Sequence, residues 1–156
     1  MTTKHILFLV ESYLPGFKSG GPVKTVYSAV KVLKKKGFDC TVVCNDRDLG
    51  DINRYENIKD GVNYISHTKV IYLRRGLLGY IKLLTMLCSK KNNFFHLNSY
   101  FSFKFSIFPR GVLWLIRSRK KVVLAPRGEL SAAALTLKSA KKSYLIWLMS
   151  LIRMDN

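Results

Sequence analysis

The chain has 156 residues, and its 27 lysines and arginines against nine aspartates and glutamates give it a formal net charge of +18. Apolar residues make up 48% of the sequence and charged residues 23%, a balance that excludes wholesale disorder and predicts one folded domain. The positive charge predicts anionic partners, and by itself it leaves nucleic acid, an anionic lipid surface and a phosphorylated small molecule as alternatives.

The first part of the chain alternates between short apolar runs and helical periodicity. Residues 5–10 (HILFLV) predict a strand, and the polar loop 11–21 that follows is rich in glycine. Apolar residues then recur at spacings of three or four over 22–36, which predicts a helix that Gly37 ends. Residues 38–44 (FDCTVVC) predict the next strand. Continuous apolar strands around a helix predict an α/β fold with a Rossmann-like, doubly wound, mostly parallel sheet.

The rest of the chain continues this alternation. In chain order we expect strands at 62–66 and 70–74, an apolar helix at 76–89, a strand at 93–98, a helix at 103–117 with Pro109 inside it or at a break, an inner strand at 121–125 and a final helix at 130–153. No strand follows this last helix to return into the sheet, and we therefore expect the chain to be a piece of a longer protein.

Cysteine usage and the absence of export signals favour the cytoplasm. Cys40 and Cys44 would lie about 13 Å apart along one strand, too far to share a zinc ion. Together with Cys88 they are expected to be reduced packing residues. Lys4 precedes only a short apolar run, unlike a signal peptide, and the longest uncharged stretch, 92–103, is shorter than the roughly 20 residues that span a bilayer.

In open α/β sheets ligands bind beyond the carboxyl ends of the strands, which selects three loops as candidate sites. The first loop ends with Gly20 and Gly21 directly before a helix, where backbone N–H groups favour an anion such as phosphate. A bare turn is the alternative interpretation. Neither the GxGxxG dinucleotide fingerprint nor the P-loop pattern is present.

The second and third loops carry polar side chains. His96 and Asn98 alternate onto one face at the end of their strand, where His96 is either a site residue or a hydrogen-bonded core histidine. Arg127 and Glu129 follow the next strand, where a buried guanidinium would require a partner. A phosphate or sugar would satisfy Arg127, and a structural ion pair with Glu129 or Glu11 is the alternative.

Taken together, these loops resemble the N-terminal domain of a retaining glycosyltransferase of the GT-B fold, in the large family 4 group. The matching stretches are 7–13 (LFLVESY) with Gly20-Gly21-Pro22, 33–45 (LKKKGFDCTVVCN), 95–99 (FHLNS) and 125–130 (APRGEL). The resemblance covers almost the whole chain in order. It implies an enzyme with two Rossmann-like domains, of which residues 1–156 form the acceptor-side domain, while the domain that holds the nucleotide-sugar is absent.

The resemblance also implies roles for individual residues. Gly20 and Gly21 would approach the donor diphosphate, and Arg127 would occupy a catalytic position where many relatives carry a histidine. The acceptor would be bound by Ser12, Tyr13, His96, Asn98 and Glu129. No cofactor and no metal are expected. Asp46-Arg47-Asp48 matches the metal-binding Asp-x-Asp motif of the GT-A fold, but a turn rich in Asp after a second strand is ordinary loop chemistry.

The implied reaction is the transfer of a sugar from a nucleotide-sugar donor to a glycan or lipid-linked acceptor in surface polysaccharide biosynthesis. The only glutamates are Glu11, Glu56 and Glu129, so the Glu-x7-Glu donor motif is missing, and the isolated chain is expected to be inactive. The alternative is a non-catalytic basic module that binds an anionic membrane, a phosphorylated glycan carrier or nucleic acid.

The clustered cations indicate which anionic partner a basic module of this kind would bind. No nucleic-acid-binding signature is present, and we expect no nucleic-acid partner. Cations beside the apolar helices at 76–89 and 103–117 favour peripheral contact with anionic lipid at the inner face of the cell membrane.

Overall fold

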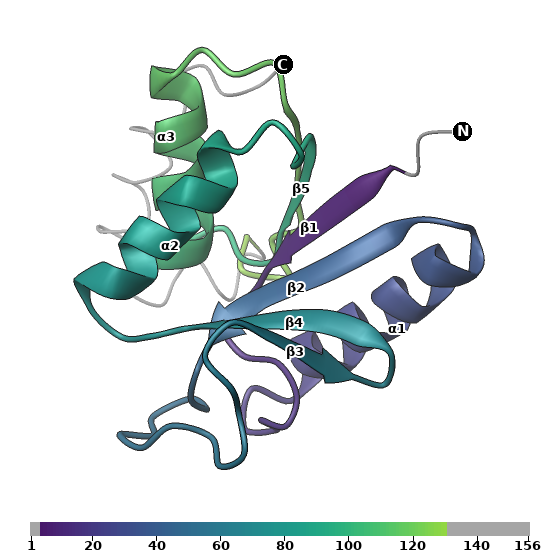
Figure 1. The fold of residues 1–156 in the computed structure, drawn as a ribbon, viewed down its shortest axis with the longest axis vertical. Helices are drawn as coiled ribbons and strands as arrows, with labels where there is room; N and C mark the ends of the chain where they lie inside the picture. The colour runs from purple at the N-terminus through teal and green to yellow at the C-terminus, as the bar shows by residue number, and fades with distance from the viewer. Residues whose placement is uncertain (1–3, 131–156) are drawn as a thin grey trace.

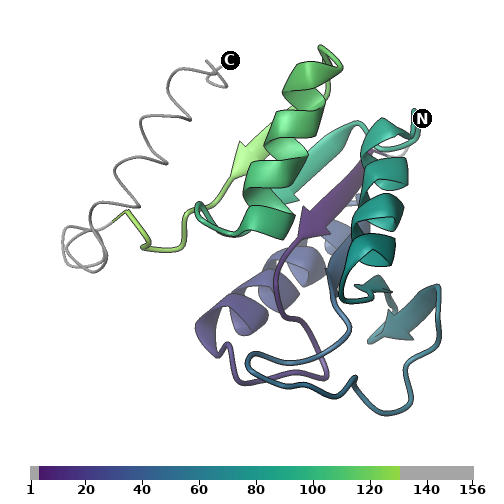
Figure 2. The same cartoon turned by 90° about the vertical axis from the view of Figure 1, so that its left-hand side faces the viewer.

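The computed structural model describes residues 4–130, which form a mostly parallel six-stranded sheet with helices on both faces (Figures 1 and 2). This confirms the α/β prediction. The helix predicted at 130–153 falls, apart from its first residue, outside the described residues. In chain order the elements are β1 (His5–Leu9), α1 (Gly21–Lys35), β2 (Asp39–Asn45), β3 (Val62–Ile65), β4 (Thr68–Leu73), α2 (Leu77–Cys88), β5 (Phe94–Leu97), a π-helical turn η1 (Phe103–Ile107), α3 (Phe108–Leu115) and β6 (Lys121–Leu124).

The sheet has the spatial order β3-β4-β2-β1-β5-β6. Only β3 pairs antiparallel, with β4, and every other pairing is parallel. Numbered along the chain by themselves, the five parallel strands stand in the order 3-2-1-4-5, which is compatible with a Rossmann-like sheet. The order reverses between β1 and β5, and this topological switch point is where such sheets bind ligands.

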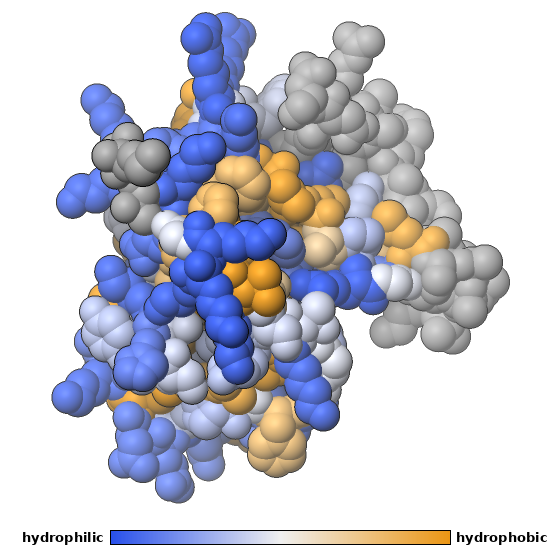
Figure 3. All heavy atoms as spheres, turned by 90° about the vertical axis from the view of Figure 1, so that its right-hand side faces the viewer, coloured by the Kyte–Doolittle hydropathy of each residue, from blue (hydrophilic) through white to orange (hydrophobic). Residues whose placement is uncertain are grey.

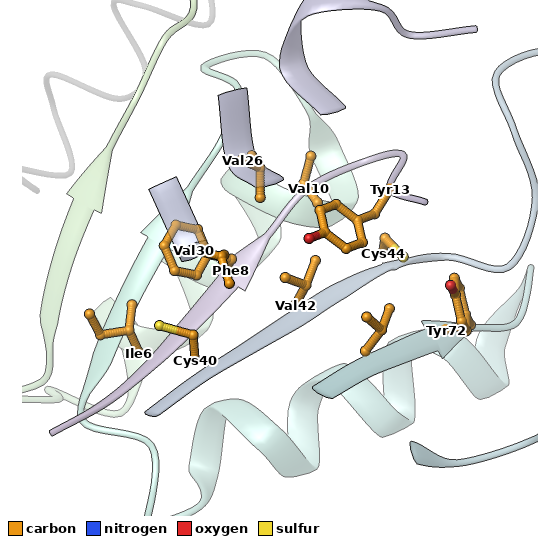
Figure 4. Packing of buried hydrophobic residues seen from close by; sticks show 11 residues of the cluster. Ile6, Phe8, Val10, Tyr13, Val26, Val30, Cys40, Val42, Cys44 and Tyr72 are labelled. Atoms are coloured by element: carbon orange, nitrogen blue, oxygen red, sulfur yellow. The ribbon is translucent and has the colours of Figure 1, made fainter. Parts of the chain in front are cut away.

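The central strands β1 and β2 are buried on both faces, as their continuous apolar runs predict. Ile6 and Phe8 of β1 point to the face that α1 covers, where Val26 and Val30 pack against them (Figure 4). The alternate residue Leu7 points to the other face, into the cluster that α2 and α3 cover. Burial of successive side chains on opposite faces explains why β1 shows no polar alternation.

Two predicted elements differ in detail. The strand predicted as an inner one, β6, is an outer strand of the described sheet, and its Val122 and Val123 are 39% and 42% exposed. A short apolar run does not distinguish an inner strand from an outer one, because the neighbours that cover it come from elsewhere in the chain. The helix predicted at 103–117 is divided into η1 and α3, and Pro109 lies in the first turn of α3, where a proline, which has no N–H to donate, is tolerated.

The cysteine prediction holds for two residues of three. Cys40 and Cys44 are buried free thiols, and burial raises the pKa of Cys40 to about 11. Cys88, also free, is exposed at the end of α2, so its assignment as a packing residue is wrong. The sequence of α2 is apolar on nearly all sides, which conceals the side that faces out. Within 4–130, no helix combines the length and the hydropathy needed to cross a bilayer.

Candidate functional site

The loops that follow β1, β5 and β6 lie side by side at the switch point. The N–H of Asn98 donates to Leu9 O at 3.0 Å, which joins the end of β5 to the end of β1. The N–H of Ala125 donates to Leu97 O at 2.8 Å, which joins the end of β6 to the end of β5. Parallel strands therefore deliver the three loops to one edge of the sheet.

A chain of hydrogen bonds ties these loops together through two carboxylates. The Ser99 hydroxyl lies 2.8 Å from Oε1 of Glu129, and the backbone N–H of Tyr100 donates to the same carboxylate. Ser102 donates its N–H to Ser99 Oγ at 3.0 Å and its hydroxyl to Glu11 at 2.7 Å. Hydroxyl and amide donors, rather than a cation, thus hold both carboxylates.

Arg127 is the cation that these carboxylates leave unpaired. Its Nη2 donates to Oδ1 of Asn98 at 2.5 Å, and its Nε is buried without a hydrogen-bond partner in the described structure. Asn98 is itself held by bonds from Nδ2 to the carbonyl oxygens of Leu9 and His96, both at 3.2 Å. Burial lowers the pKa of Arg127. Within the described part of the chain no carboxylate pairs with Arg127, so the ion pair with Glu129 or Glu11 is not formed.

His96 lies on the α1 side of the sheet, where its ring stacks on Phe8 with centroids 4.8 Å apart. Its Nδ1 is buried and has no hydrogen-bond partner among residues 4–130. Burial, and secondly the charge of Arg127, lower the pKa of His96, which favours the neutral imidazole near pH 7. His96 is therefore packed as a core residue whose one unsatisfied nitrogen lies near the Arg127 charge.

Ser12 and Tyr13, the two acceptor candidates in the first loop, have different positions. Ser12 is buried but lines a cavity at the carboxyl edge of the sheet. Tyr13 is fully buried in the cluster between the sheet and α1, and burial raises its pKa to about 12. A ligand would reach Ser12 directly, and would reach Tyr13 only after the core rearranged.

Gly20 and Gly21 begin α1 on an open surface. Gly20 is the N-cap residue with a φ of 59°, a left-handed conformation that favours glycine, and α1 has no acidic residue in its first turn. A Cβ added at either glycine would meet no atom within 4 Å, so a ligand has room to approach the backbone. The N–H of Gly20 donates to Phe17 O at 2.9 Å. The hydrogen bonds of Gly20 thus stay within its own loop and helix, whereas Asn98 and Arg127 contact each other directly.

The Asp46-Arg47-Asp48 segment anchors this glycine loop. Asp46 is 1% exposed and lies 2.9 Å from the Nε atoms of both Arg47 and Arg54. Asp48 accepts the backbone N–H groups of Phe17 at 2.7 Å and of Lys18 at 3.0 Å. Burial opposes ionisation of Asp48, but these N–H groups lower its pKa on balance. In the described residues no three metal-ligating side chains gather; Asp48 holds the glycine loop, and Asp46 pairs with two arginines.

A cavity of about 470 Å³ opens beside the switch point, at the carboxyl ends of β1, β2 and β4. Glu11 and Ser12 line one part of it and Lys104 another. The Lys104 ammonium donates to Asn45 Oδ1 at 2.9 Å and to Arg74 O at 3.3 Å, and burial lowers its pKa. Lys104 was not among the residues predicted from the sequence. A single lysine inside the otherwise uncharged run 103–108 could have indicated a cation at a buried position.

Comparisons of this chain with models of known families, with curated proteins and with solved structures found no match. The geometry of the switch point and the resemblance of the loop motifs are therefore the basis for a functional assignment.

Proposed function

We propose that this chain is the acceptor-side domain of a GT-B glycosyltransferase that transfers a sugar from a nucleotide-sugar donor to a glycan or lipid-linked acceptor. The observation that carries the proposal is the unpaired guanidinium of Arg127 at the switch point. Asn98 orients this group, while Glu129 and Glu11 are occupied by serines. A partly buried guanidinium that no carboxylate pairs suits a phosphate or the hydroxyls of a sugar.

In the proposed reaction the bond between the anomeric carbon and the donor diphosphate breaks, and a bond from that carbon to an acceptor oxygen forms. The diphosphate leaves with the electron pair of the broken bond and takes up the proton that the acceptor hydroxyl loses. Arg127 and the backbone N–H groups at Gly20 and Gly21 would stabilise the negative charge that develops on the diphosphate. The cavity lined by Ser12 and Lys104 would hold the acceptor.

Calorimetric titration of the purified chain with a hexose 1-phosphate and with uridine diphosphate tests the proposal. Arg127→Gln should weaken binding of the phosphorylated sugar at least tenfold, because a hydrogen bond to a charged group contributes about 1.5–3 kcal/mol. Arg119→Gln removes the same charge from an exposed position and should change affinity less than twofold. Equal weakening by the two variants would mean that only net charge matters and would refute a site at Arg127.

Activity measurements test the division into domains. The chain alone should show no sugar transfer or donor hydrolysis, because the donor-binding motif is missing from its sequence. Turnover of a nucleotide-sugar by the purified chain would contradict the assignment to the acceptor side.

A further inference from the structure

Helix α2 carries an apolar stripe on the side that faces away from the sheet. Leu83 and Leu87 bury its inner side. Leu77, Ile81 and Leu84 recur at spacings of four and three residues on the outer side, where they are 74%, 49% and 40% exposed. Surface helices normally place polar residues on that side, so this stripe requires an explanation.

Helix α3 extends the stripe into a broader surface. It lies beside α2 on the same face of the sheet (Figure 2), and the rings of Tyr80 and Phe108 make an edge contact at 5.2 Å between the two helices. Trp114 and Leu115 of α3 are 54% and 74% exposed. We call this surface the α2–α3 face, which comprises Leu77, Leu78, Ile81, Leu84, Trp114 and Leu115.

The charge around the α2–α3 face is one-sided. Residues 61–128 contain thirteen lysines and arginines and no aspartate or glutamate. Of these cations only Arg74 forms an ion pair with a carboxylate in the described structure. Exposed cations stand at the ends of both helices: Arg75 before α2, Lys90 and Lys91 after α2, and Arg117 and Arg119 after α3. The apolar surface is therefore bordered by cations without counter-charges.

We infer that the α2–α3 face docks on an anionic lipid surface, with its aliphatic side chains among the acyl chains and the bordering cations on the headgroups. The exposed Trp114 on this face suits the interfacial region of a bilayer. A second copy of the chain would bring the same cations against one another, and nucleic acid would leave the aliphatic stripe in water.

The opposite face of the sheet lacks this combination. Among the residues of α1 the only large apolar side chain that is exposed is Val32. Figure 3 views the side toward which α1 lies in Figure 1, and there hydrophilic side chains project around and between smaller hydrophobic patches. The inference concerns α2 and α3 only and does not rest on the proposed glycosyl transfer.

Cosedimentation of the full chain with vesicles tests the inference. The chain should bind vesicles that contain phosphatidylglycerol and phosphatidylcholine at low salt, and pure phosphatidylcholine vesicles at least tenfold more weakly. The double variant Ile81→Glu with Leu84→Glu should lose binding by at least tenfold. Val32→Glu adds one acidic residue at an exposed position of α1. As a control it should reduce vesicle binding much less.

Two further measurements locate the contact. Arg117→Gln with Arg119→Gln should weaken binding by about 25-fold, at about fivefold per cation, whereas Lys31→Gln with Lys35→Gln on α1 should have a small effect. In a Trp147→Phe background Trp114 is the only tryptophan, and its emission should shift to the blue with anionic vesicles only.

The opposite results would overturn the inference. If the double lysine variant on α1 and the double arginine variant after α3 lost equal amounts of vesicle binding, net charge alone would attract the chain to lipid. A dimer in light scattering that the Ile81→Glu, Leu84→Glu variant dissolves, or duplex binding that the same variant weakens as strongly as vesicle binding, would assign the face to another partner. Vesicle binding is measured without any sugar donor, so its outcome is separate from that of the transferase proposal.

Discussion

Gly79 is the position at which one added methyl group should test the packing of α2 most directly. A Cβ built on Gly79 lies 2.1 Å from the carbonyl oxygen of Arg74 and 3.2 Å from its carbonyl carbon. These atoms belong to the backbone that connects β4 to α2, so no side chain can rotate away. We therefore predict that Gly79→Ala destabilises the fold, although alanine is the better helix former.

The magnitude follows from the distance that has to be relieved. Ordinary contact begins at 3.4 Å, so α2 must move about 1.3 Å from Arg74. Such a shift loosens Leu83 and Leu87, which are both fully buried against the sheet. Overpacking against backbone atoms lies in the upper part of the usual range, at about 2–3 kcal/mol, and the helix propensity of alanine returns at most about 1 kcal/mol. The expected net loss is about 1–2 kcal/mol, or about 2–8 °C in Tm for a chain of this size.

Thermal and urea unfolding of Gly79→Ala and Gly111→Ala measure this difference. Gly111 lies in α3, and a Cβ there meets nothing within 4 Å, so the same substitution should raise stability by up to about 1 kcal/mol. Opposite signs for the two variants support the close approach of α2 to the β4–α2 connection. A Gly79→Ala chain as stable as the unmodified one would refute it.

Three other predictions concern single side chains. Glu129→Gln should weaken the contact between the loops after β5 and β6 by about 1.5–3 kcal/mol, seen as faster hydrogen exchange of the Tyr100 amide, whereas the exposed Glu56→Gln should change nothing. Because burial lowers the pKa of His96 from its ordinary 6.5, the unfolded chain binds this proton more readily, and the free energy of unfolding should fall as the pH drops below 6.5. Urea unfolding across pH should show that His96→Phe lacks this part of the decline, and an unchanged profile would contradict it. A thiol reagent should modify Cys88 rapidly in the native chain and the two buried cysteines only in urea.

The strands and helices were predictable because burial on both faces leaves a simple pattern. The apolar run 5–10 became β1, and the periodic segments 22–36 and 76–89 became α1 and α2, with bounds shifted by one residue. The position of β6 at the border of the described sheet was not predictable in the same way. It depends on which segments supply neighbours, and a run such as KVVLA contains no information about that.

The sequence predicted the location of the candidate site better than the contacts between its side chains. Parallel strands bring their carboxyl ends to one edge, and this brought Asn98 and Arg127 into contact. The preference of Glu129 for Ser99 over Arg127 depends on loop geometry, including the positive φ of 52° at Arg127, a conformation uncommon for arginine. No local sequence pattern specifies that conformation.

The positions of the acidic residues determine where on the molecule the positive charge is uncompensated, which the net charge alone does not show. Five of the nine acidic residues lie between positions 46 and 60, where Asp46, Asp51 and Asp60 form ion pairs with neighbouring cations. Among residues 61–130, every lysine and arginine except Arg74, which pairs with Asp60, is therefore left without an ion-pair partner. Charges more than about 10 Å apart are largely screened in 0.1 M salt, so a partner responds to the local arrangement and hardly to the total of +18. Removal of two cations should thus have unequal effects on the two faces of the sheet, although it changes the net charge equally.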